Sequence, residues 1–172
     1  MTSDNVIVFG HKEHGKDAVC EYLEHRYGVS FSGSSWYACK TFLFDQIKEE
    51  FGYATPEECY ADRRNHRQLW YEAIRDYNKD DRAKMGKEIF CESTIYCGIR
   101  DREEFEALKD QGAFSAAIWI DSSKRLPPES SESMNLSIFD SDFIVDNNRV
   151  LADLHRELDA LADKMGWYAR DR

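Results

Sequence analysis

Short apolar runs alternate with longer amphipathic stretches along the chain. The apolar runs have the length of buried strands and cover residues 5–9, 29–32, 94–97, 115–120 and 142–145. Between them, apolar residues recur at helical spacing over residues 16–27, 35–51, 56–77, 82–92, 102–111 and 151–166. This alternation predicts an α/β fold in which helices cover both faces of a five-stranded parallel sheet.

Two segments depart from the alternation. Residues 35–92 form one helical stretch after another without a convincing strand, which predicts a helical insertion beyond one edge of the sheet. The polar, Ser- and Pro-rich segment "DSSKRLPPESSESM", residues 121–134, predicts a mobile loop. A chain of 172 residues fits one domain, so we expect a single core of residues 1–34 and 93–172 that carries both additions.

Composition and charge narrow the range of partners. With 23 basic and 33 acidic residues the net charge is −10, which argues against nucleic acid but not against a small anion held at contact distance. The apolar runs are far shorter than the ~20 residues of a membrane span, and the first residues lack the pattern of a signal peptide. We therefore expect no membrane partner and a cytoplasmic location. The five cysteines show no C-x-x-C spacing, so we expect reduced thiols and no zinc site.

The clearest motif lies between the first predicted strand and the first predicted helix. "GHKEHGKD", residues 10–17, matches the phosphate-loop pattern G-x-x-x-x-G-K-[ST] at Gly10, Gly15 and Lys16. Glycines let successive backbone N–H groups point at phosphate oxygens, and the lysine reaches the β- and γ-phosphates. A plain strand-to-helix turn is the alternative. The motif predicts ATP-binding residues Gly10, His11, Lys12, Glu13, His14, Gly15, Lys16, Asp17 and Ala18.

Asp17 departs from this pattern, which has Ser or Thr at that position. Its carboxylate could hold Mg²⁺ directly or through a water, or it could serve the dipole of the first helical turn. The sequence leaves both roles open.

The G-K-D ending resembles that of bacteriophage deoxynucleoside monophosphate kinases. The similarity extends through "ADRRNHRQLWYEAIRDYNKDD", "IYCGIRDREEFEA", "IWIDSSKRLPPESSESM" and "DFIVDNN", and so covers most of the chain. The resemblance implies a three-layer P-loop kinase fold with a helical monophosphate-binding insertion and a short lid over residues 121–134. It also implies transfer of the γ-phosphoryl group of ATP, with Mg²⁺, to a deoxynucleoside monophosphate (dNMP), in the host cytoplasm if the chain is phage-encoded.

A basic cluster in the insertion is the candidate acceptor site. On a continuous helix Arg63 and Arg67 would share one face, with Trp70 and Tyr71 near the same stripe. Guanidinium groups match phosphate oxygens, and an aromatic ring can stack on a base. A solvated basic face with Trp70 in the core is the alternative. The resemblance favours a phosphate-binding role for Arg64 or Arg67.

Residues that follow the second and third predicted strands add to this site. Arg100, after the strand at 94–97, resembles the strand-then-Arg element of the phage kinases, which implies contact with the acceptor phosphate. Asp101 either orients a water on Mg²⁺ or caps the helix that follows. Ser34 and Ser35 follow the second strand and could touch the acceptor or form a turn.

The remaining candidates lie in the lid and after the last strand. Lys124 and Arg125 could fold over the phosphates and, with Lys16 and Arg100, make up the expected catalytic set. Asn147 and Asn148 lie where kinases with this order of elements hold the donor adenine, although turns also favour Asn.

Two other functions compete with the dNMP kinase. One is a kinase of another small phosphorylated acceptor, similar to phosphomevalonate kinase, and the other is a non-catalytic nucleotide-dependent binding module. The sequence leaves open whether the chain is a monomer or a homodimer.

Overall fold

A central parallel sheet organises the structure, a computed structural model that describes residues 4–170. Its strand order is β2-β3-β1-β4-β5, and every neighbouring pair is parallel. The strands are β1 (Val6–Phe9), β2 (Phe31–Gly33), β3 (Ile95–Cys97), β4 (Ala116–Asp121) and β5 (Phe143–Asp146). The five-stranded α/β fold predicted from the apolar runs is confirmed.

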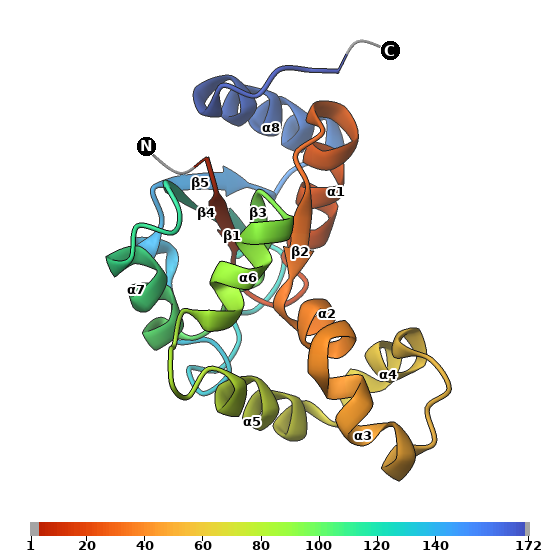
Figure 1. Cartoon of the computed structure of the whole chain (residues 1–172). Coiled ribbons are helices and arrows are strands. Elements are labelled where there is room, and N and C mark those ends of the chain that lie inside the picture. Colours follow the sequence, from red (N-terminus) through yellow and green to blue (C-terminus); the bar gives the residue numbers. More distant parts are fainter. Residues whose placement is uncertain (1–3, 171–172) are drawn as a thin grey trace.

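Helices cover both faces of the sheet, because the three central strands, β3, β1 and β4, are buried on both sides. On one face α1 (Lys16–Tyr27) and α8 (Leu151–Met165) bury Leu23, Leu154 and Leu158 against the strands. On the other face α6 (Lys84–Glu92) and α7 (Arg102–Asp110) pack Ile89 and Leu108 against a second apolar layer. Figure 1 shows α1 and α8 together at the top of the molecule.

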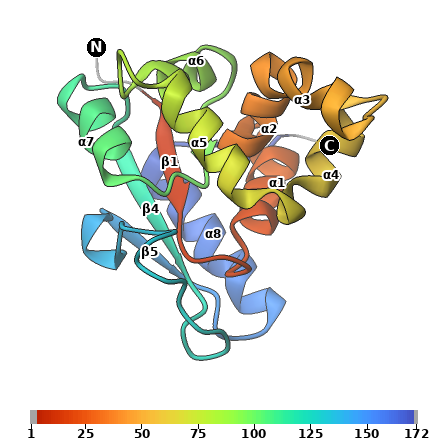
Figure 2. The same cartoon turned by 90° about the horizontal axis from the view of Figure 1, so that it is seen from below.

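The helical insertion forms a lobe beside the sheet, at the bottom right of Figure 1. It contains α2 (Ser34–Ala38), a π-helical turn (Cys39–Leu43), α3 (Phe44–Phe51), α4 (Pro56–Asp62) and α5 (Arg67–Tyr77). The lobe has its own small core around Leu43, Ile47 and Trp70. Seen from below, in Figure 2, α5 lies between β1 and the helices α2 and α4. The helix α6 also falls in the range expected for the insertion, but it packs on the sheet.

The predicted single helix over residues 56–77 is wrong. It breaks into α4, a 3₁₀ turn at Arg63–Asn65 and α5. Asp62 lies at the break, where its carboxylate accepts hydrogen bonds from Tyr53 Oη (2.5 Å), Asn65 Nδ2 (2.6 Å) and His66 Nε2 (3.0 Å). The bond from Tyr53, which precedes α4, ties this turn to the rest of the lobe.

The loop after β4 crosses the carboxyl edge of the sheet and ends at a short 3₁₀ turn, Ile138–Asp140. It has no regular helix or strand over residues 122–137, as its Ser- and Pro-rich sequence predicts. Met134 and Leu136 anchor its second half in the apolar layer under α6 and α7. Within residues 4–170, no helix is long and apolar enough to cross a membrane.

Candidate functional site

The loop from Gly10 to Asp17 adopts a backbone that requires glycine at two points. Gly10 has φ +151°, and a Cβ there would lie 2.7 Å from the carbonyl oxygen of Ile120. Gly15 has φ +98° and stands immediately before α1. No side chain of the described residues caps this end of α1. The first N–H groups of the helix therefore face the loop and favour an anion.

Lys16 is folded back over this loop. Its ammonium group donates a hydrogen bond of 2.8 Å to the carbonyl oxygen of His11. Burial lowers the pKa of Lys16, and the nearby guanidinium of Arg100 lowers it further. The positive charges of Lys16 and Arg100 repel each other, so an anion bound between them would relieve the repulsion.

The loop opens on a cavity of about 770 Å³ that also contains the predicted acceptor residues. Lys12, Glu13, Lys16 and Asp17 line its loop side. The whole predicted acceptor set lines the remainder: Ser34, Ser35, Arg63, Arg64, Arg67, Trp70, Tyr71 and Arg100. The cavity lies at the carboxyl ends of β1, β2 and β3, where open parallel sheets bind their ligands.

The arginines reach the cavity by a different geometry from the one the sequence suggests. Arg63 lies in the 3₁₀ turn and Arg67 begins α5, so the prediction that they share one face of a continuous helix is wrong. Arg63 is held by Tyr60: it donates to the Tyr60 carbonyl oxygen at 2.8 Å and lies 3.9 Å from the ring centroid. Arg64 and Arg67 are exposed and form no ion pair with the described part of the chain. They are free to bind an anionic ligand.

Trp70 and Tyr71 belong to the same wall. Trp70 is buried and is part of the core of the lobe, as the alternative of a solvated basic face with Trp70 in the core predicts. It also lines the cavity. Its indole N–H has no acceptor within residues 4–170. The Tyr71 side chain is exposed. The wall therefore offers aromatic surface to a ligand.

Arg100 is paired with a lid residue that the sequence did not single out. Its Nη1 donates to Glu129 Oε1 at 2.5 Å, while the backbone N–H of Lys12 donates to Glu129 Oε2 at 2.7 Å. One carboxylate thus binds both the phosphate loop and the expected acceptor arginine. These two donors, a backbone N–H and a guanidinium, are of the kinds that also bind phosphate oxygens.

Two histidines of the loop hold the lid against it. His11 Nδ1 accepts from the backbone N–H of Glu129 at 3.1 Å, and His14 Nδ1 accepts from that of Ser122, also at 3.1 Å. The opposite nitrogen of His14 lies 3.3 Å from the carbonyl oxygen of Pro127. Both rings accept at Nδ1 only when that nitrogen is unprotonated. Burial lowers the pKa of His11, with the neighbouring His14 as the second cause, which favours this state.

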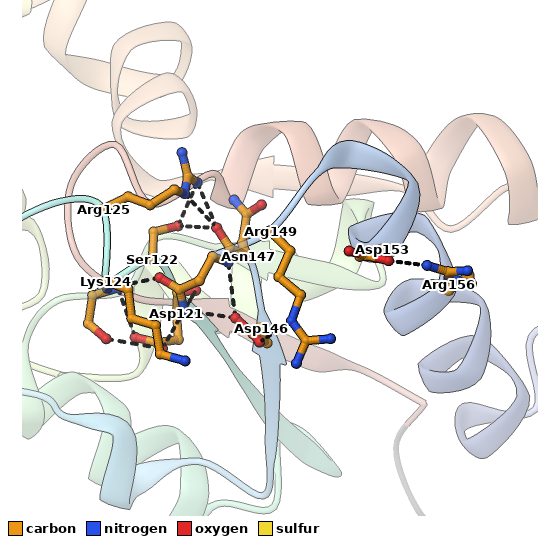
Figure 3. Close-up of polar contacts among 11 residues, drawn as sticks. Asp121, Ser122, Lys124, Arg125, Asp146, Asn147, Arg149, Asp153 and Arg156 are labelled. Carbon is orange, nitrogen blue, oxygen red and sulfur yellow. Dashed lines mark hydrogen bonds and ion pairs between the residues drawn. The ribbon is translucent and has the colours of Figure 1, made fainter.

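Lys124 and Arg125 lie beside the ends of β4 and β5 and do not line the cavity. Figure 3 shows Arg125 directed back at the protein: its Nη2 donates to the Asn147 carbonyl oxygen at 2.6 Å and to Ser122 Oγ at 3.2 Å. In this arrangement neither cation reaches the groups around Arg100. Their catalytic role stays a prediction that requires the lid to move.

The two asparagines after β5 serve the fold in this structure. Asn147 Nδ2 donates to the His14 carbonyl oxygen at 2.9 Å, which ties the loop after β5 to the phosphate loop. Asn148 Nδ2 donates to Asp146 Oδ1 at 2.7 Å and to Asp121 Oδ2 at 3.0 Å. The adenine contact expected of these amides stays a prediction.

Two carboxylates are candidates to hold Mg²⁺ at this cavity. Asp17 lines the cavity, and one of its oxygens lies 3.7 Å from the thiol of Cys97. Asp101 also lines it and caps α7, accepting from the Glu104 N–H at 3.2 Å. Among the described residues no group of three or more His, Cys, Asp or Glu could hold a metal by itself. One or two carboxylates suit an ion bound mainly by phosphate oxygens and water.

Sequence reasoning missed two acidic residues of the site, Glu129 in the lid and Glu104 in α7. Glu104 is buried and also lines the cavity. The helical spacing of α7 places residue 104 on the same apolar face as Leu108. A charged residue on an apolar helix face is unusual, and this could have marked Glu104 in the sequence. Nothing local marks Glu129, because its partners lie far away in the chain.

Known structures with a similar backbone include small-molecule kinases. A shikimate kinase from Bacteroides thetaiotaomicron superposes with a TM-score of 0.53 at 9% identity, over 94% of this chain and 98% of that one. A shikimate kinase from Aquifex aeolicus matches with a TM-score of 0.48 at 14% identity, over 94% and 96% of the two chains. A gluconokinase from Sinorhizobium meliloti matches with a TM-score of 0.45 at 16% identity, over 96% and 97%.

In sequence, no protein-family model matches the chain, and no curated protein is significantly similar to it. The likeness to the first shikimate kinase extends over nearly the whole of both chains. The chain therefore has the fold of a P-loop small-molecule kinase.

Proposed function

We propose that the chain is an ATP-dependent kinase that phosphorylates a deoxynucleoside monophosphate. One observation carries the proposal: the phosphate loop and the arginines predicted to bind the acceptor line the same cavity. A kinase must hold two anionic substrates at contact distance, and this cavity offers separate cations for each.

The roles follow from the position of each group. Lys16 and the N–H groups at the start of α1 would hold the β- and γ-phosphates of ATP. Arg100, Arg64 and Arg67 would hold the acceptor phosphate, with Ser34 and Ser35 beside it. Asp17 and Asp101 would hold Mg²⁺ together with phosphate oxygens, and that ion neutralises charge on the transferred group.

The transfer needs no side chain as a base. An oxygen of the acceptor phosphate attacks the γ-phosphorus, the bond from that phosphorus to the β–γ bridging oxygen breaks, and ADP leaves. A phosphate monoester has a second pKa of about 6, so its attacking oxygen is already ionised at neutral pH. The protein supplies positioning and charge.

Glu129 must leave the phosphate loop before the nucleotide binds, because it uses the Lys12 N–H and the Arg100 guanidinium. Release of the lid would also free Lys124 and Arg125 to approach the phosphates. The same exchange of Glu129 for phosphate would suit a nucleotide-dependent binding module, which is the second candidate function.

Turnover with an acceptor panel separates the candidates. ADP release is measured with ATP, Mg²⁺ and, one at a time, dAMP, dGMP, dCMP, dTMP, their ribose counterparts and phosphomevalonate, with Lys16→Met as the control. Turnover that depends on a dNMP and is lost in the control supports the kinase. Turnover only with phosphomevalonate assigns another acceptor, and ATP binding without turnover on any acceptor favours the binding module.

A further inference from the structure

The carbonyl oxygen of His14, the residue before Gly15 in the phosphate loop, is held by two side chains from the ends of neighbouring strands. Ser122 Oγ, directly after β4, and Asn147 Nδ2, directly after β5, each donate to it at 2.9 Å. The one proton of the Ser122 hydroxyl has a second acceptor in reach, the Asn147 carbonyl oxygen at 3.1 Å, but that oxygen already accepts two bonds from Arg125. The His14 carbonyl is therefore directed at the ends of β4 and β5.

The imidazole of His14 is bound on the same side. The backbone N–H of Ser122 donates to His14 Nδ1 at 3.1 Å, and His14 Nε2 donates to the Pro127 carbonyl oxygen at 3.3 Å. His14 is only 1% exposed, and Ser122 is fully buried. Rotation of the peptide after His14 would break these carbonyl bonds where water cannot replace them, so the peptide is held in one orientation.

This orientation sets the direction of the Gly15 N–H. The peptide bond between His14 and Gly15 is planar and trans, so its C=O and N–H point in opposite directions. Because the carbonyl points at the ends of β4 and β5, the N–H points away from them. No acceptor within residues 4–170 binds this N–H. The donor lies directly before Lys16, at the start of α1, and is free to bind an anion there.

Asn147 is packed against the same peptide. Gly15 has φ +98°, and a Cβ on it would lie 2.4 Å from Asn147 Nδ2. A side chain at residue 15 would therefore have to displace the Asn147 amide and break its bond to His14. The second glycine of the motif lets the asparagine reach the loop.

We propose that Asn147 and Ser122 are positioning residues of the phosphate loop: by holding the His14 carbonyl, they direct the Gly15 N–H at a phosphate oxygen of the donor nucleotide. The inference rests on the proposed function in one respect, that the loop binds the phosphates of ATP. It gives Asn147 a role at the phosphates, whereas the expected adenine contact gives it a role at the base. A donor that is already oriented needs no reorganisation when the phosphate arrives, which strengthens binding.

One measurement reports on this peptide bond directly. His–Gly occurs once in the sequence, so protein labelled with carbon-13 at the histidine carbonyl and nitrogen-15 in glycine gives a single carbonyl-edited amide signal, that of Gly15. We expect the Gly15 amide proton to move downfield when magnesium tripolyphosphate, which has no base or sugar, is added to the wild type. A signal that does not move while calorimetry records binding overturns the inference.

The variants Asn147→Leu and Ser122→Ala each remove one donor to the His14 carbonyl, and leucine keeps roughly the size of asparagine. With Mg²⁺ present, we expect each variant to raise the Kd for ATP and the Kd for tripolyphosphate by the same factor, roughly 5- to 10-fold. The KM for the dNMP should not change. Ser141→Ala is the control, because the Ser141 hydroxyl also donates to a carbonyl oxygen, that of Ile138, but lies before the amino end of β5.

The outcomes separate this inference from its alternatives. Weaker binding of ATP with unchanged binding of tripolyphosphate in Asn147→Leu assigns the asparagine to the adenine and overturns the inference, and so does an equal loss in Ser141→Ala. A wild type that binds neither ligand refutes both this inference and the proposed function. Tripolyphosphate binding with the Gly15 shift, but without turnover of any dNMP, refutes the proposed function alone. The wild-type Gly15 signal decides even if a variant does not fold.

Discussion

The Glu129 carboxylate and the Arg100 guanidinium form an ion pair of 2.5 Å across the mouth of the phosphate loop. The Glu129 side chain is only 10% exposed, so the pair is shielded from water on the carboxylate side. The second carboxylate oxygen takes a backbone N–H of the loop at 2.7 Å. One carboxylate therefore binds both a backbone N–H of the loop and a guanidinium, two donors that also suit phosphate oxygens.

Replacing Glu129 should strengthen ATP binding. In Glu129→Gln the competing negative charge is absent, and the repulsion between Lys16 and Arg100 is relieved only by the ligand. We expect the Kd for ATP with Mg²⁺ to fall about tenfold in titration calorimetry without acceptor, as the loss of one charge-assisted bond implies. Glu132→Gln is the control, since Glu132 is exposed and lines the same cavity. Weaker binding by Glu129→Gln would show that Glu129 belongs to the liganded site.

The phosphate loop should not tolerate alanine at Gly10. The variant Gly10→Ala combines a positive φ with a Cβ 2.7 Å from the Ile120 carbonyl oxygen. We expect the free energy of unfolding to fall by about 2 kcal/mol or more, with loss of ATP binding. Gly52→Ala is matched in having a positive φ, but open space surrounds its Cβ. It should cost about 1 kcal/mol and leave ATP binding intact. Equal losses of unfolding free energy in Gly10→Ala and Gly52→Ala, measured by urea unfolding, would contradict the close approach of Gly10 to Ile120 of β4.

The free arginines of the lobe should act on the acceptor alone. We expect Arg64→Gln and Arg67→Gln each to raise the KM for the dNMP on the order of tenfold, because each removes a charge-assisted bond to phosphate. The KM for ATP should not change. Arg156→Gln is the control, since Arg156 pairs with Asp153 on α8, away from the cavity (Figure 3). A parallel rise in both KM values would place these arginines at the donor instead.

Features set by local sequence were predictable. The apolar runs located all five strands, and the three central ones are the most continuously apolar because they are buried on both faces. The spacing of Gly10, Gly15 and Lys16 identified the loop, because its backbone requires glycine at fixed positions. The location of Arg100 at the cavity followed from its place after a parallel strand.

Features set by distant contacts were not predictable. Glu129 lies 117 residues from Lys12, so no periodicity links them. The break before α5 coincides with a hydrogen bond from Tyr53 to Asp62, and residues 62–66 contain no Gly or Pro to announce it. The orientation of Arg125 depends on the Asn147 carbonyl oxygen, which only the folded sheet brings near.

Glu104 should make stability depend on pH. Its pKa is about 8 in the folded state, mainly through burial, against about 4.5 when exposed. Between these values unfolding releases a proton, so the wild-type free energy of unfolding falls as pH rises and this contribution is lost by about pH 8. Glu104→Gln cannot titrate, so its stability relative to the wild type should increase by a few kcal/mol between pH 4.5 and pH 8. Urea unfolding at pH 5, 6.5 and 8 measures this difference, in which titration of Asp101 and other shared groups cancels.

Glu106→Gln, on the exposed face of the same helix, should leave the pH profile unchanged. Parallel profiles for the wild type and Glu104→Gln would show that the carboxyl is ionised in the folded protein.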